Sequence, residues 1–146
     1  GWKYAEYEMK GVPLRLEIGP RDIEENQCVL VRRDNREKAF VSLDALEETI
    51  PQLLESVRQG LYDKALANRE ARTVTATTLE ELVEKAGAQN CFIKTMWCGD
   101  EACELKLKEV AGVTSRCMPF AQEHLADTCV CCGRPAKTMI YWGKAY

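Results

Sequence analysis

Cys98-Gly-Asp-Glu-Ala-Cys103 and Cys129-Val-Cys-Cys132-Gly133 are the two segments that decide the fold of the second half of this chain. Each segment carries a cysteine pair with two to four residues between its members, and a short insert separates the pairs. This is the ligand pattern of a tetrahedral zinc site, and four thiolates leave no open position for chemistry. The spacing therefore predicts a structural zinc ion held by Cys98, Cys103, Cys129 and Cys132.

Two other cysteines compete for places in this site. Cys131 is adjacent to Cys132, but the two-residue spacing and Gly133, which permits a left-handed backbone, favour Cys132. Cys117 would be a ligand only if the metal-binding cysteines pair differently from the two segments above. A zinc-free alternative is a redox protein that uses Cys129 and Cys132, and this requires an exposed thiolate with a lowered pKa.

The cysteine content also bears on the compartment. Eight cysteines in 146 residues indicate either disulfides in an oxidising compartment or metal ligands and free thiols in the cytosol. The first residues, Gly1-Trp-Lys-Tyr4, lack a starting Met and an apolar signal segment. We therefore expect a cytoplasmic protein, and a piece of a longer one.

The composition is typical of a soluble globular protein, with 46% hydrophobic and 29% charged residues. No apolar run approaches 18 residues, so no membrane span is expected. The net charge of −3 argues against a protein coated for non-specific nucleic-acid binding, although a local basic site is compatible with it. The single histidine and the lack of a phosphate-binding or dinucleotide motif give no catalytic set.

The pattern of the first half predicts strands and one long helix. Residues 1–10 resemble the end of a helix, 14–18 alternate as a half-buried strand, and 28–31 and 39–41 flank a hairpin tip. Residues 21–26 are interpreted as a loop or one helical turn. Ser42 is the expected N-cap of a helix that continues to about residue 68, with a kink or restart at Pro51, and its apolar stripe is interpreted as core.

The second half follows a polar boundary at residues 70–77, which predicts domains at 1–72 and 73–146. A capping box at Thr78 begins a helix that ends at Gly87. Strands at 91–97, 113–120 and 138–142 and a helix at 101–111 follow. The fold class is therefore α/β (α+β), and a metal would stabilise the small core of the second domain.

Charged residues of both signs surround the first predicted strand. Carboxylates can accept from base amino groups, and arginine can donate two bonds to guanine. Trp2, Tyr4 and Tyr7 could supply an aromatic platform for unstacked RNA bases. By chemistry alone, a solvated amphipathic strand is the stronger interpretation of these residues. The charged residues that could contact RNA bases in this way are Glu8, Arg15, Glu17 and Arg21.

Several segments in order along the chain carry a family resemblance. Residues 1–22, GWKYAEYEMKGVPLRLEIGPRD, resemble the anticodon-binding domain of archaeal/eukaryotic-type prolyl-tRNA synthetases. The second half is similar to that family's C-terminal zinc-binding domain. Its matching segments are WCGDEAC (97–103), TSRCMPF (114–120), CVCCGRPAK (129–137) and GKAY (143–146).

The resemblance implies the C-terminal region of a class II proline–tRNA ligase. It implies a partial mixed-sheet anticodon-binding domain that lacks its first strand and helix, followed by a small α/β zinc-binding domain. Glu8, Arg15, Glu17 and Arg21 would then meet the guanines of the proline anticodon. The carboxylate of Tyr146 would reach toward the catalytic region, and Cys131 departs from the commoner family pattern.

The resemblance also implies partners and cofactors. These are tRNA(Pro), proline and ATP with Mg²⁺ in an upstream catalytic domain, structural Zn²⁺ in this chain, and a homodimer without membrane contact. The chain alone would be inactive, because the catalytic domain lies outside it. The alternative class is a non-enzymatic zinc-ribbon interaction module or the cysteine-pair redox protein described above.

Overall fold

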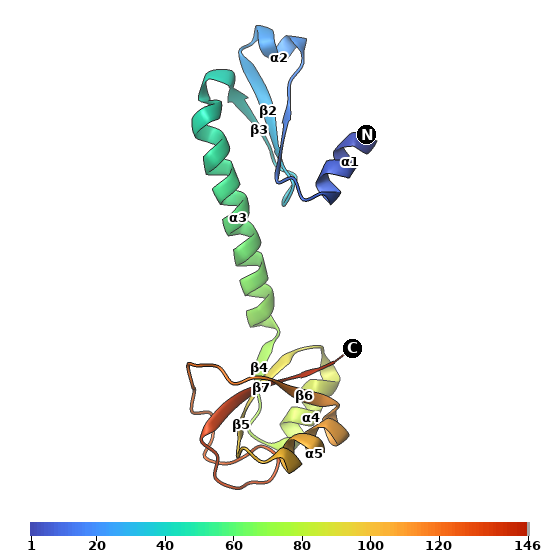
Figure 1. Cartoon of the computed structure of the whole chain (residues 1–146), viewed down its shortest axis with the longest axis vertical. Coiled ribbons are helices and arrows are strands. Elements are labelled where there is room, and N and C mark those ends of the chain that lie inside the picture. The colour runs from blue at the N-terminus through green and yellow to red at the C-terminus, as the bar shows by residue number, and fades with distance from the viewer. Residues whose placement is uncertain (146) are drawn as a thin grey trace. The chain divides into compact units, whose positions relative to one another are not determined.

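The computed structural model of the chain describes residues 1–145, and it contains two compact units, Gly1–Ala67 and Asn68–Tyr146. Each unit has its own sheet and contains both helices and strands (Figure 1). The division falls inside the helix α3 (Leu46–Ala71), before the boundary at 72/73 that the sequence suggests. The assignment of these units as the two domains named above remains a prediction. In the part of the chain that is described, no helix is long and apolar enough to span a bilayer.

The first unit contains a three-stranded antiparallel sheet in the order β1-β2-β3. Its core is small, because Cys28, Leu30 and Val31 of β2 and Val57 of α3 are its buried apolar residues. The elements are α1 (Trp2–Met9), β1 (Leu14–Glu17), α2 (Pro20–Glu24), β2 (Gln27–Arg32), β3 (Lys38–Ser42), a 3-10 turn (Leu43–Ala45) and α3.

The segment after Gly19 is the expected helical turn, and two expectations for the helix α3 need correction. The segment after Gly19 forms the helix α2, whose Asp22 side chain accepts from the Gly19 amide at 2.8 Å. The apolar stripe of α3 is mostly not core: Leu54 and Leu61 are 41% and 44% exposed. Three short strands present too little apolar surface to cover a helix of 26 residues. The helix is also continuous through Pro51, without a restart.

The second unit contains a four-stranded mixed sheet in the order β4-β5-β7-β6. β4 runs parallel to β5, and the other neighbours are antiparallel. β4 was not predicted, because Thr-Val-Thr is short, polar and at the sheet edge. The elements are β4 (Thr73–Thr75), α4 (Leu79–Ala88), β5 (Phe92–Trp97), α5 (Glu101–Ala111), β6 (Val113–Cys117) and β7 (Thr138–Lys144).

The helix ends of this unit follow local signals. The Thr78 side chain accepts from the Glu81 amide at the start of α4, and the Asp100 side chain accepts from the Ala102 amide at the start of α5. Gly112 ends α5 with φ +66°, a left-handed conformation that favours glycine.

One face of the sheet is covered by α4 and α5. Leu82 and Leu107 of these helices pack against Ile93, Ile140 and Trp142 of the sheet. The indole of Trp142 is 0% exposed, and its Nε1 donates to Oγ1 of the equally buried Thr95 at 2.9 Å. This pair is a polar link inside an otherwise apolar core.

Among residues 1–145, the cover of the opposite face lies at the end where Met96 and Met139 are, and the segment between β6 and β7 provides it. Gln122 of this segment continues the ladder beyond β6: its Oε1 accepts from the Met139 amide at 2.6 Å, and its Nε2 donates to the Met139 carbonyl at 3.2 Å. The rest of this face carries Phe92, Lys94 and Tyr141 and lines an open hollow. Tyr146, for which the resemblance implies a role, lies outside the described residues.

Candidate metal centre and RNA-reading surface

The structure brings four cysteine sulfurs together in the second unit. The Sγ atoms of Cys98, Cys103, Cys129 and Cys132 all lie within 4.8 Å of one another. Cys98 Sγ is 3.7 Å from the Sγ atoms of both Cys103 and Cys132. Zn–S bonds of about 2.3 Å in a tetrahedron place sulfurs roughly 3.8 Å apart, so the set fits a zinc ion.

Two turns position these sulfurs. The first follows β5 through Gly99, with φ +86°, so that Cys98 precedes α5 and Cys103 lies in its first turn. In the second turn, the Gly133 amide donates to the Cys129 carbonyl at 3.0 Å, and Gly133 has φ +70°. These turns bring pairs that are distant in the sequence to one point.

The remaining candidates lie outside this cluster. Cys131 packs against the apolar clusters instead, and Cys117 is exposed on β6. The geometry thus groups Cys132 and not Cys131 with the other three sulfurs. The ligand role of the four cysteines remains a prediction.

Arg134 is a member of this site that the spacing of the cysteines did not reveal. Its Nε donates to Cys132 Sγ at 3.3 Å, and its guanidinium also pairs with the Asp100 carboxylate. The bond from Arg134 is the main cause that lowers the pKa of the Cys132 thiol to about 6, whereas burial raises the pKa of Cys103. A divalent cation would favour the thiolate form of every sulfur in the set.

In the first unit, Arg15 is held between two carboxylates. Its Nη1 lies 3.0 Å from Glu8 Oε1, and its Nε and Nη2 both lie 2.8 Å from Glu17 Oε1. Burial opposes the charge on Arg15, but Glu17 and Glu8 outweigh it and raise its pKa. Arg36 also contacts Glu8 at 2.5 Å, and this bond is the main reason that the pKa of Glu8 is lowered.

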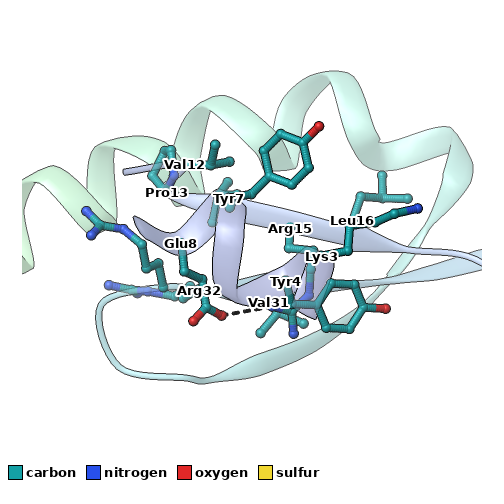
Figure 2. A pocket seen from close by; sticks show the side chains of 12 residues that line it. Lys3, Tyr4, Tyr7, Glu8, Val12, Pro13, Arg15, Leu16, Val31 and Arg32 are labelled. Atoms are coloured by element: carbon teal, nitrogen blue, oxygen red, sulfur yellow. Dashed lines mark hydrogen bonds and ion pairs between the residues drawn. The ribbon is translucent and has the colours of Figure 1, made fainter. Parts of the chain in front are cut away.

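This network borders a cavity of about 220 Å³ between α1 and the sheet of the first unit (Figure 2). The guanidinium carbon of Arg15 lies 3.9 Å from the centre of the Tyr4 ring, a cation–π contact. Tyr7 also lines the cavity, whereas Trp2 is exposed and does not. The tyrosines therefore supply aromatic surface beside the charged groups.

Arg33 is a second residue that sequence reasoning missed. It lines the same cavity, and its Nε is buried without a hydrogen-bond partner among residues 1–145. A buried unpaired donor is costly, so this atom favours an acceptor from outside the chain. Arg33 lies in the hairpin after β2, and its amide donates to the Pro13 carbonyl at 2.9 Å. This position beside β1 is the one signal that could have marked Arg33 as part of the site.

Arg21 is separated from the other predicted RNA-reading residues. It is exposed on α2, which follows the end of β1 opposite to α1 (Figure 1). It does not line the cavity beside Arg15. The structure thus groups Glu8, Arg15 and Glu17, and it places Arg21 at the other end of the strand.

Family models match both parts of the chain. Residues 1–53 match the anticodon binding domain, and residues 79–146 match the C-terminal domain of prolyl-tRNA synthetase. A proline–tRNA ligase 2 of Bacillus thuringiensis subsp. konkukian is 62% identical over all 146 residues, which span 31% of that protein. A proline–tRNA ligase of Clostridium novyi is also 62% identical, and the chain spans 30% of it. The chain thus covers less than a third of the length of these curated relatives.

Solved structures agree with the sequence matches. The prolyl-tRNA synthetase of Cryptosporidium parvum, in complex with L-proline and AMP, superposes on the whole chain with a TM-score of 0.90 at 33% identity. The chain covers 31% of that structure. It therefore belongs to the prolyl-tRNA synthetase family, as an anticodon-binding domain followed by the C-terminal domain of that family.

Proposed function

We propose that this chain is the tRNA-reading C-terminal region of a proline–tRNA ligase, which attaches proline to tRNA(Pro) at the expense of ATP. The observation that carries the proposal is the Arg15 guanidinium, held between Glu8 and Glu17 and against the Tyr4 ring in an anticodon-binding domain. The catalytic domain, with its ATP and Mg²⁺, would lie outside this chain. A cytoplasmic homodimer is part of the same proposal.

The chemistry of the network suits guanine. Arginine can donate two bonds to guanine O6 and N7, and a carboxylate can accept from the guanine amino group. In the free chain these groups bond to one another, so a guanine would replace those bonds with its own. The ring of Tyr4 and the neighbouring ring of Tyr7 offer stacking surface for an unpaired base. Arg21, at the other end of β1, would meet another guanine of the anticodon.

We also propose that the four clustered cysteines hold a structural zinc ion. Support comes from their mutual distances and from Arg134, which stabilises a thiolate before any metal binds. The ion would join the turn before α5 to the turn at residues 129–133. It would thereby stabilise a unit of modest core size and take no part in the reaction.

The RNA-reading role is tested with Arg15→Ala in a full-length ligase. Losing one bidentate base contact costs about 1–3 kcal/mol, so kcat/KM for charging of tRNA(Pro) should fall roughly 5–150-fold. Proline-dependent ATP–pyrophosphate exchange, which needs no tRNA, should be unchanged. Lys64→Ala, which removes an equal charge from an exposed site on α3, is the matched control. An equal loss in both assays after Arg15→Ala contradicts a base-reading role.

The metal proposal has its own test. Purified chain in reducing buffer should contain one zinc per chain, and a strong chelator should release it and unfold the second unit, as reported by the buried Trp142. Metal-free protein that keeps its structure and oxidises rapidly and reversibly at Cys129 and Cys132 would instead support the redox alternative.

A further inference from the structure

The uncovered part of the second sheet presents a defined set of side chains. The register pairs Thr75 with Lys94, Lys94 with Tyr141, and Tyr141 with Cys117, and it pairs Thr73 with Phe92 in the next row. Paired residues share a face, so all of these lie opposite α4 and α5. They line a hollow of about 690 Å³. Phe92, the first residue of β5, is 42% exposed there.

A β-bulge adds an arginine to this face. Ser115 pairs with Trp142 and Cys117 with Tyr141, so Arg116 is the extra residue of β6. Its Nη2 donates to the Gly143 carbonyl at 3.1 Å. A Cβ on Gly143 would lie 3.2 Å from Arg116 Nε and 3.4 Å from a ring carbon of Phe92. The absence of a side chain at Gly143 thus lets a guanidinium and an aromatic ring both approach the backbone of β7 at this residue.

A second hollow of about 520 Å³ continues from the first and shares Arg69, Phe92 and Arg116 with it. The charge of the two together is strongly positive. Their lining holds five basic residues but a single acidic one, Glu70, in a unit whose sequence has ten of each. The basic residues are Arg69, Arg72, Lys94, Arg116 and Lys144.

Most of this charge is uncompensated. Within residues 1–145, only Lys94 of the five forms an ion pair, to Glu123 at 2.7 Å. Three of the four arginines of the unit lie here, and the fourth, Arg134, is at the cysteine cluster. Basic side chains around an exposed aromatic ring on an open sheet are the surface that unpaired nucleotides require, for their phosphates and for stacking of their bases.

We propose that this face binds a single-stranded segment of RNA, with phosphates on Arg69, Arg72 and Lys144 and a base stacked on Phe92. An acidic protein segment would use the charges equally well, but it would gain little from an exposed ring beside a guanidinium. This second RNA contact is independent of the network around Arg15, and it does not depend on recognition of guanine.

The test uses the full chain and a fluorescein-labelled oligouridine of about ten nucleotides, a probe that contains no guanine. Fluorescence anisotropy gives the Kd at several salt concentrations. Arg69→Gln with Arg72→Gln removes two charges from the face. Lys106→Gln with Lys108→Gln removes two from exposed positions of α5 and is the matched control. Phe92→Ala is compared with Phe120→Ala, which deletes a fully exposed ring elsewhere.

We expect the double arginine variant to weaken binding about tenfold and to lower the slope of log Kd against log salt by about 1.4, since each phosphate contact contributes about 0.7. Phe92→Ala should weaken binding by at least about fivefold. Both controls should bind like the parent chain, and circular dichroism should show every variant folded.

Three results would overturn the proposal. The first is no binding, or binding that neither the arginine pair nor Phe92 affects. The second is binding that Arg15→Ala alone abolishes, which would assign the oligouridine to the first unit. The third is equal competition by oligoglutamate of the same charge together with no effect of Phe92→Ala, which would identify an acidic protein partner.

Discussion

The hydrogen bond between Trp142 and Thr95 gives the most direct test of how the second unit is held together. Both residues are 0% exposed, and the indole Nε1 donates to Thr95 Oγ1 at 2.9 Å. Thr95→Val keeps the shape of the side chain but removes the acceptor. The buried N–H then loses its partner, at a cost of about 1–3 kcal/mol. For a domain of this size, each kcal/mol corresponds to roughly 4–8 °C in Tm.

The assay is urea unfolding of the full chain, followed by tryptophan fluorescence. Trp97 and Trp142 lie edge to face, with ring centroids 6.3 Å apart, and report on the second unit, whereas Trp2 is exposed in the first. A Trp2→Phe background therefore isolates the signal. The lost stability should appear as a lower midpoint with an unchanged slope m.

Thr114→Val is the matched control for this experiment. Thr114 lies in β6, half-buried, and the same substitution there removes no acceptor from a buried indole. Its effect should stay within about 0.5 kcal/mol. If Thr95→Val were as stable as the control, the bond between the indole and the hydroxyl would contribute nothing, and apolar packing alone would hold Trp142.

Two further predictions concern the other charged clusters. Arg134→Gln should weaken zinc binding about 10–100-fold, because the variant loses the guanidinium that stabilises the Cys132 thiolate. Competition with a chromogenic chelator measures this affinity. An unchanged affinity would mean that the metal ion alone, without Arg134, keeps Cys132 in its thiolate form. The bond from Arg32 to Asp34, at 2.7 Å, lowers the pKa of Asp34 in the folded chain. The ion pair therefore contributes its full stability above a pH of about 4, where Asp34 is ionised even in the unfolded chain. This stability is lost as the pH falls through the pKa that Asp34 has in the folded chain. Asp34→Asn should therefore be less stable than the parent chain at neutral pH and approach it in acid, and a constant difference at all pH values would contradict this ion-pair effect.

Local signals in the sequence predicted most of the helices and strands. The cap at Thr78 was predicted from its own segment, and the Asp100 cap and the left-handed Gly112 that the structure shows lie equally close to the helix that they bound. The position of β7 between β5 and β6 was not predictable in this way, because no pattern within one strand identifies its neighbours. β4 was missed because three edge residues carry no alternation.

The candidate sites show the same difference between local and distant information. Spacing alone suggested the four cysteines, because each pair lies within one turn. Arg134, Arg33 and the basic face around Arg116 depend on folding that brings distant segments together, and no spacing rule indicates them. The apolar stripe of α3 was interpreted as core because periodicity reports amphipathicity and not what covers a helix.

The two bonds from the Gln122 side chain to Met139 have a consequence for solubility. β6 ends at the level of Tyr141, so the outer edge of β7 beyond that point would otherwise offer its amide and carbonyl to a strand of another molecule. A carboxamide presents one acceptor and one donor, as a peptide group does, and so it caps this edge from within the same chain. The protein thereby blocks intermolecular strand addition at β7 without lengthening β6.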